Sequence, residues 1–130
     1  MSLEPRWITS AVVIDIAATV LEDTCEPFLL RDAGLLESAV MVPRNRWYYE
    51  DERDWLVLGL GLALAIARNH PFEQGNKRAA WFAMLNFFGM NDVALLNEDD
   101  PVYADLFVEV VTGAQPPEHL LALLRLAGPR

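Results

Sequence analysis

One run of nine residues, His70-Pro71-Phe72-Glu73-Gln74-Gly75-Asn76-Lys77-Arg78, combines a proton acceptor, a glycine and two cations. An imidazole has an unperturbed pKa of about 6.5, so it can act as a base near neutral pH. Lysine and arginine bind phosphate oxygens, the first as a point charge and the second through a bidentate fork. A base beside a phosphate-binding group is what the transfer of a phosphate to a hydroxyl requires. The run therefore predicts a phosphate-transfer site.

The run lies between two stretches that predict buried helices. Residues 54–67, DWLVLGLGLALAIA, are almost uninterrupted apolar sequence and are longer than most strands. In residues 76–88, NKRAAWFAMLNFF, apolar side chains recur at helical intervals, and Gly89 stands where a C-cap is expected. Pro71 disfavours the α conformation at the residue before it, so the first helix should end at His70. Gly75 then permits a tight turn into the second helix.

The start of the second helix is where we expect an anion to bind. The first N–H groups of a helix lack internal partners and carry the positive end of its dipole. We expect the N–H groups of Gly75, Asn76 and Lys77 to hold phosphate oxygens, assisted by the side chains of Lys77 and Arg78. The alternative is an ordinary polar loop between helices. A pattern that fixes about six positions arises by chance in only ~1 in 10^5 chains of this size, which favours the site.

These residues resemble the signature of the Fic/Doc superfamily. Five positions match it: His70, Phe72, Gly75, Asn76 and Arg78. Lys77 is similar to the death-on-curing (Doc) branch, whereas the adenylyl-transferring Fic branch has a glycine there and an arginine where this chain has Trp81. Residues 31–40, RDAGLLESAV, followed by a proline and a Tyr-Glu pair, also resemble the N-terminal half of Doc-type proteins. The resemblance therefore covers most of the chain.

The resemblance implies one all-α domain over residues 1–130 with the Fic fold. It implies that the terminal phosphate of ATP or another nucleoside triphosphate moves to a hydroxyl side chain of a translation factor, elongation factor Tu in the best-known case. In that scheme His70 is the base, Phe72 anchors the loop in the core, and Asn76 orients the loop or a phosphate. Gly75, Lys77 and Arg78 bind the phosphates.

Growth arrest by such a toxin implies a neutralising antitoxin. Other Fic proteins carry an internal inhibitory helix with Ser or Thr, three spacers, Glu and then Gly or Asn, and this sequence contains no such stretch. We therefore expect an antitoxin protein supplied in trans, as a short amphipathic helix that lies in a groove of this domain.

Gln74 departs from the family pattern. The resemblance places an acidic residue there, which helps to hold Mg²⁺ against the nucleotide phosphates. Magnesium prefers charged oxygen ligands, so a carboxamide should bind it less well, although its carbonyl oxygen remains a ligand. Glu73 is adjacent, but neighbouring helical residues point about 100° apart, so it would reach the same point only after a shift of the loop. Gln74 or Glu73 is thus a weak metal ligand.

Two other functions stay open at this point. The same histidine base would support transfer of a whole nucleoside monophosphate, with the nucleotide reversed, although Lys77 and Trp81 speak against this. Alternatively, Gln74 has removed the metal, and the domain acts as a binding module that sequesters a partner or a nucleotide.

Composition favours a compact intracellular protein and excludes several function classes. The 130 residues are 53% hydrophobic, enough for one core, and their formal net charge of −9 would repel nucleic acid. Against that charge, Arg68, Lys77 and Arg78 gather positive charge beside the motif. The single cysteine, Cys25, excludes an internal disulfide and is predicted to be partly buried. No signal peptide precedes the chain and no apolar run reaches the roughly 20 residues of a membrane span, so we expect a cytoplasmic location without a membrane.

The rest of the sequence reads as helices with one exception. Helices are predicted over 9–20, from a cap at Asp32 to Met41, from Asp100-Pro101 to about Thr112, and over 118–127. Pro43 should end the second of these, and the aromatic residues of 43–50 suit a short extended or β-hairpin element, a flap in the resembled family. Residues 90–96 predict a turn with a short apolar stretch. The acidic clusters 50–52 and 98–100 are weak metal candidates, and His119 receives no functional role.

Overall fold

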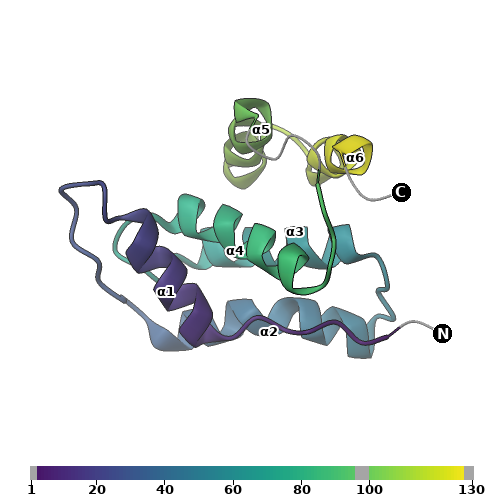
Figure 1. Cartoon of the computed structure of the whole chain (residues 1–130), viewed down its shortest axis with the longest axis horizontal. Helices are drawn as coiled ribbons and strands as arrows, with labels where there is room; N and C mark the ends of the chain where they lie inside the picture. Colours follow the sequence, from purple (N-terminus) through teal and green to yellow (C-terminus); the bar gives the residue numbers. More distant parts are fainter. Residues whose placement is uncertain (1–2, 96–99, 128–130) are drawn as a thin grey trace.

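The computed structural model describes residues 3–95 and 100–127, and within these ranges the regular elements are six helices and no strand. In order they are α1 (Ser10–Val20), α2 (Ala33–Tyr49), α3 (Trp55–Asn69), α4 (Asn76–Met90), α5 (Pro101–Thr112) and α6 (Pro117–Ala127). Helices α3 and α4 lie side by side in the centre, with α1 and α2 below them and the α5–α6 pair above them (Figure 1). The all-α prediction is confirmed.

The first of the two central helices, α3, forms because its apolar sequence begins at a strong cap. The Asp54 carboxylate accepts hydrogen bonds from the N–H groups of Leu56 and Val57 at 3.0 and 3.4 Å, which satisfies two of the unpaired donors at the start of α3. Leu58, Leu62 and Ile66 are then fully buried. Each such side chain contributes about 1.5–3 kcal/mol of hydrophobic stabilisation. The predicted helix over 54–67 is confirmed, and it continues two residues further, to Asn69.

Helix α4 packs on α3 through small residues and two phenylalanines. Ala79, Ala80 and Ala83 are fully buried, as are Phe87 and Phe88 at the far end of the helix. Gly59 of α3 makes this approach possible, because a Cβ at that position would overlap the ring of Phe88. The close approach of the two helices at this end depends on that missing side chain.

The predicted extended or hairpin flap over 43–50 is wrong. Helix α2 continues through Pro43 and ends only at Tyr49. A proline inside a helix removes one hydrogen bond and costs about 3 kcal/mol. The continuation, however, buries Pro43 itself and Trp47, whose ring packs edge-on against Trp7 with 6.1 Å between centroids. Packing against the N-terminal segment and α3 outweighs the local preference of the proline.

The helix ends match the predictions where a local signal decides them. Asp32 caps α2 by accepting from Leu35 N–H at 2.9 Å, Asp100 caps α5 by accepting from Val102 N–H at 3.0 Å, and Gly113 ends α5 with φ of 86°. The predicted C-cap at Gly89 is wrong, because α4 runs to Met90. The side chain of Asn91 donates to the Phe87 carbonyl at 2.8 Å and so closes the helix later.

The predictions for Cys25, His119 and the two acidic clusters can also be compared with the structure. Cys25 is exposed, and not partly buried as predicted. His119 is exposed, with its Nδ1 atom 2.8 Å from Gln115 Oε1. Glu50 and Glu52 lie 3.5 and 3.7 Å from the Arg46 guanidinium. Residues 96–99, which include most of the second acidic cluster and the end of the predicted turn, lie outside the described residues.

The C-terminal helix pair α5–α6 contacts the start of α3 through an ion pair of 2.5 Å between Arg125 and Asp54.

Within residues 3–95 and 100–127, no helix combines the length and the apolar character that crossing a bilayer requires.

The close packing of α3 on α4 gives a first prediction. Gly59→Ala should lower the free energy of unfolding by about 1–3 kcal/mol, because the added methyl group overpacks the contact with Phe88. Urea denaturation measures this change. Gly89→Ala is the matched control, since it lies in α4 with open space around its Cβ position and should be neutral or stabilising by up to about 1 kcal/mol. Equal effects of the two substitutions would contradict this packing.

Candidate functional site

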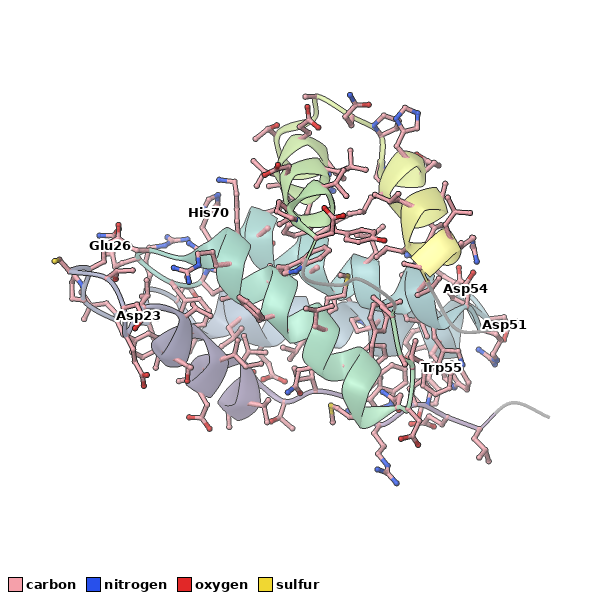
Figure 2. The ribbon with its side chains drawn as sticks, turned by 45° about the horizontal axis from the view of Figure 1, so that its top comes forward. Asp23, Glu26, Asp51, Asp54, Trp55 and His70 are labelled. Carbon is pink, nitrogen blue, oxygen red and sulfur yellow. The ribbon has the colours of Figure 1, made fainter. Side chains whose placement is uncertain are left out.

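The candidate site is the loop that joins the end of α3 to the start of α4. Its first residue, His70, is the C-cap of α3 and has left-handed backbone angles, φ 50° and ψ 55°. Pro71 disfavours the right-handed α conformation at the residue before it, and His70 takes left-handed angles, which end the helix there as predicted. A non-glycine residue adopts this conformation at a cost of about 1–2 kcal/mol. The imidazole is exposed, at the same end of the molecule as Asp23 and Glu26 (Figure 2).

Asn76, the first residue of α4, ties this loop to the helix. Its side-chain oxygen accepts from the N–H of Phe72 at 3.0 Å, and its nitrogen donates to the carbonyl of Phe72 at 2.8 Å. The same nitrogen lies 3.5 Å from Nδ1 of His70. Asn76 is only 8% exposed, so these bonds form away from water, where leaving either backbone group unpaired would be costly. One amide thus sets the position of the loop backbone and faces the imidazole.

Phe72 fixes the middle of the loop in the core. Its side chain is 1% exposed and packs against the ring of Phe28, with 5.7 Å between centroids. Its backbone pairs with Leu30 in an isolated antiparallel bridge, and the N–H of Glu73 donates to the carbonyl of Leu29 at 3.0 Å. The loop between α1 and α2 therefore lies alongside the motif loop and supports it.

Arg31 is a residue of this site that the sequence reasoning missed as a site residue. Its guanidinium donates to the carbonyl of His70, through Nε at 2.8 Å and also through Nη2, and to the carbonyl of Asn69 at 3.1 Å. Its own N–H donates to the carbonyl of Pro71 at 2.7 Å. A cation on the last carbonyl groups of α3 satisfies unpaired acceptors and favours the helix dipole. No sequence signal links Arg31 to a loop so distant in the chain.

The start of α4 has the geometry of an anion site. Gly75, the N-cap, has φ of 75° and offers no side chain to the first N–H groups of the helix. A side chain there would be strained, and its Cβ would lie 3.1 Å from the side chain of Leu21. In the described part of the chain, the side chains of Lys77 and Arg78 have neither an ion-pair partner nor a hydrogen-bond partner. The start of α4 thus offers backbone N–H donors and two cationic side chains to an anion.

Two hollows meet at this end of α4. A groove of about 940 Å³ runs between α1 and α4, and a smaller one of about 310 Å³ lies between α4 and α5. Arg78, Phe82 and Leu85 line both, and Lys77 lines the smaller one. Arg68, predicted to join the positive charge here, lines neither and donates to the carbonyl of Val110 at 3.4 Å.

Trp81 lies one turn further along α4 and faces the interior. It is 7% exposed and packs against Phe107 of α5, with 5.5 Å between the ring centroids. This position, where the adenylyl-transferring branch is expected to have an arginine, therefore belongs to the contact between α4 and α5 and offers no cation to a phosphate.

The residues predicted as weak metal ligands differ in their surroundings. Both Glu73 and Gln74 are exposed. With its amide nitrogen turned toward Glu26, Gln74 donates to both oxygens of that carboxylate, at 2.8 and 3.1 Å. Within residues 3–95 and 100–127 no three His, Cys, Asp or Glu side chains converge as a metal site would require. One carboxylate still suffices for Mg²⁺ when nucleotide phosphates supply further ligands, so the residues present fit that ion only together with a nucleotide.

Comparison with known proteins gives three matches. The model of the Fic/DOC family matches residues 7–88, which hold α1 to α3, the loop and α4 up to Phe88. Toxin Doc of Mycolicibacterium smegmatis is 41% identical over 86 residues, which cover 64% of this chain and 65% of that protein. Protein kinase doc of Escherichia phage P1 is 33% identical over 84 residues, 65% of each chain. The match thus spans just under two thirds of both relatives.

The hydrogen bonds of Asn76 give a second prediction. Asn76→Ala should lower the free energy of unfolding by about 1–3 kcal/mol, because it leaves two backbone groups of Phe72 without partners. It should also speed hydrogen exchange at the Phe72 N–H, which NMR can follow in the native protein. Asn86→Ala, on the exposed face of the same helix, is the control and should change neither quantity. Unchanged exchange at Phe72 in Asn76→Ala would show that Asn76 does not hold the loop.

Proposed function

Because the chain belongs to the Fic/DOC family, we propose that it is the toxin of a toxin–antitoxin module and moves the terminal phosphate of a nucleoside triphosphate to a protein hydroxyl. The carrying observation is that Asn76 binds the loop backbone and faces the imidazole of His70, while it also begins the helix whose free N–H groups and cations suit phosphate. Base and anion site are therefore held by one side chain. The names of the two relatives, a toxin and a protein kinase, support the same class.

The proposed reaction follows from that geometry. The exposed imidazole of His70 takes the proton of the target hydroxyl, and the hydroxyl oxygen forms a bond to the terminal phosphorus. The bond from that phosphorus to the bridging oxygen breaks, and a nucleoside diphosphate leaves. Gly75, Asn76 and Lys77 hold the phosphates through backbone N–H groups, with the side chains of Lys77 and Arg78. Mg²⁺, when bound, would neutralise phosphate charge.

We propose ATP as the donor and a translation factor, such as elongation factor Tu, as the substrate, in the cytoplasm. The support for this target is the resemblance of the motif to the Doc branch. The alternative transfer of a nucleoside monophosphate is disfavoured by the burial of Trp81, where that branch is expected to have an arginine. A binding module without catalysis remains the second candidate, and the observation in its favour is the neutral amide of Gln74 at the position where the family pattern has an acid.

Label transfer separates these functions. The protein is incubated with a bacterial extract and ATP labelled at the α or the γ phosphate in parallel. We expect label on protein from the γ position only, and loss of that label in His70→Asn. Asparagine is chosen because it tolerates left-handed backbone angles, so the substitution removes the base without adding strain. His119→Ala, which removes the other histidine, should retain the activity.

The other outcomes assign the alternatives. Label from the α position would establish nucleotidyl transfer. No label from either position, with the protein folded, would leave the binding module as the function.

A toxin needs a partner that restrains it, and we propose a protein antitoxin that binds as an amphipathic helix in the groove between α1 and α4. This groove is lined largely by apolar side chains, among them Val12, Ile16, Phe82 and Leu85, and it holds one charge of each sign, Asp15 and Arg78. A helix laid there would also cover Arg78 and so obstruct the phosphate site.

Growth of a bacterial host tests the toxin proposal. Expression of this chain without any partner should arrest growth, because no internal inhibitor is expected, and His70→Asn at equal protein level should not. Colony counts after induction measure the effect. Normal growth with the wild-type chain, or arrest that persists in His70→Asn, would contradict the proposed mode of action.

A further inference from the structure

We propose that Glu26, in the connection between α1 and α2, supplies the carboxylate that the motif lacks at position 74. This inference rests on the proposed function, since the ligand is a divalent cation that enters with a nucleoside triphosphate. With the Gln74 amide turned so that its nitrogen faces Glu26, that nitrogen donates to both oxygens of the carboxylate, at 2.8 and 3.1 Å. The negative charge expected on the motif itself therefore stands directly beside it, on a different part of the chain.

The place of Glu26 is fixed from both sides. Before it, Leu21 ends α1 with its side chain against Gly75 of the motif, the position where an added Cβ would be 3.1 Å away. After it, Phe28 packs on Phe72, and the backbone of residues 29–32 hydrogen-bonds to the motif loop. The connection that carries Glu26 is thus attached to the motif on either side of it.

The surroundings of Glu26 leave its charge available. Glu26 is exposed, and in the described ranges no lysine, arginine or histidine side chain forms an ion pair with it. Its partner Gln74 is neutral and contacts the carboxylate through one nitrogen, so lone pairs on both oxygens stay free. A single carboxylate beside a phosphate site is a common way for proteins to hold Mg²⁺, with phosphate and water oxygens as the remaining ligands.

The acid at position 26 explains why residue 74 is neutral. Two carboxylates at about the spacing of Glu26 and Gln74 would repel each other, and one would tend to take up a proton. An amide at 74 removes this repulsion and donates a hydrogen bond that orients the carboxylate. Gln74 is accordingly a positioning residue for Glu26, and the motif has exchanged the positions of amide and acid.

The test measures nucleotide binding and requires no catalysis. Calorimetry gives the affinity of the full chain for the non-hydrolysable ATP analogue AMP-PNP, with Mg²⁺ and with EDTA. We expect Mg²⁺ to tighten binding by the wild-type protein. Glu26→Gln should weaken binding in Mg²⁺ on the order of tenfold, the scale of effects at metal sites, and should not weaken it in EDTA. Asp23→Asn, an exposed acid in the same connection, should behave as wild type.

A double variant makes the test specific for the exchange. Glu26→Gln combined with Gln74→Glu returns the acid to position 74 beside an amide at 26, and it should restore the Mg²⁺ dependence. The inference is overturned if Glu26→Gln keeps the wild-type response to Mg²⁺, or if the double variant does not regain it. Binding of AMP-PNP that is insensitive to Glu26 would overturn this inference alone. No binding of AMP-PNP by the folded wild-type protein would overturn the proposed function with it.

Discussion

The pair of hydrogen bonds between the Asn76 side chain and the backbone of Phe72 is the interaction on which the site depends. The loop between α3 and α4 has six residues, and without these two hydrogen bonds its backbone could adopt several conformations. One buried amide removes that freedom, because it satisfies a donor and an acceptor of the loop at once. It does so from the first residue of α4. Asn76 therefore fixes the position of the loop relative to the N-terminus of α4, the helix that would bind the anion.

The rest of the structure supports this arrangement from outside. Phe72 places the middle of the loop in the core, and Arg31 holds the carbonyl groups at the end of α3. At the opposite ends of α3 and α4, Gly59 lets the two helices approach closely. The core and the connection between α1 and α2 thus both hold the loop in place. In an otherwise acidic protein, the two cations of the motif then line the two hollows beside α4, and within residues 3–95 and 100–127 neither has an ion-pair partner.

How much of this could be predicted from the sequence depends on the range of the interaction. Asp32 and Asp100 cap their helices through bonds to residues two or three positions away, so these helix starts could be predicted. The turn at Gly75 could be predicted because glycine adopts left-handed backbone angles without side-chain strain. The flap was predicted wrongly because the local effect of Pro43 was given more weight than the packing of Trp47, which only the fold reveals.

Long-range contacts in the site were beyond such reasoning. Arg31 and Glu26 meet the motif loop from the connection between α1 and α2, and neither residue differs in sequence from an ordinary solvated charge. The motif predicts which residues carry the proposed chemistry, whereas the contacts that support them cannot be predicted from spacing in the sequence. This explains why Gln74 appeared as a defect in the sequence, while in the structure it is one half of a pair.

We propose that the start of α4 and the imidazole of His70 form one site, in which both lie against the same bound nucleotide. Titration of the isotope-labelled protein with AMP-PNP, followed by the NMR shifts of backbone amides and of the imidazole, tests it most directly. We expect the largest changes on the amides of residues 75–78 and on the ring of His70, and we expect Asn76→Ala to weaken them. Shifts confined to the groove between α1 and α4, or shifts at the helix start with none at His70, would contradict it.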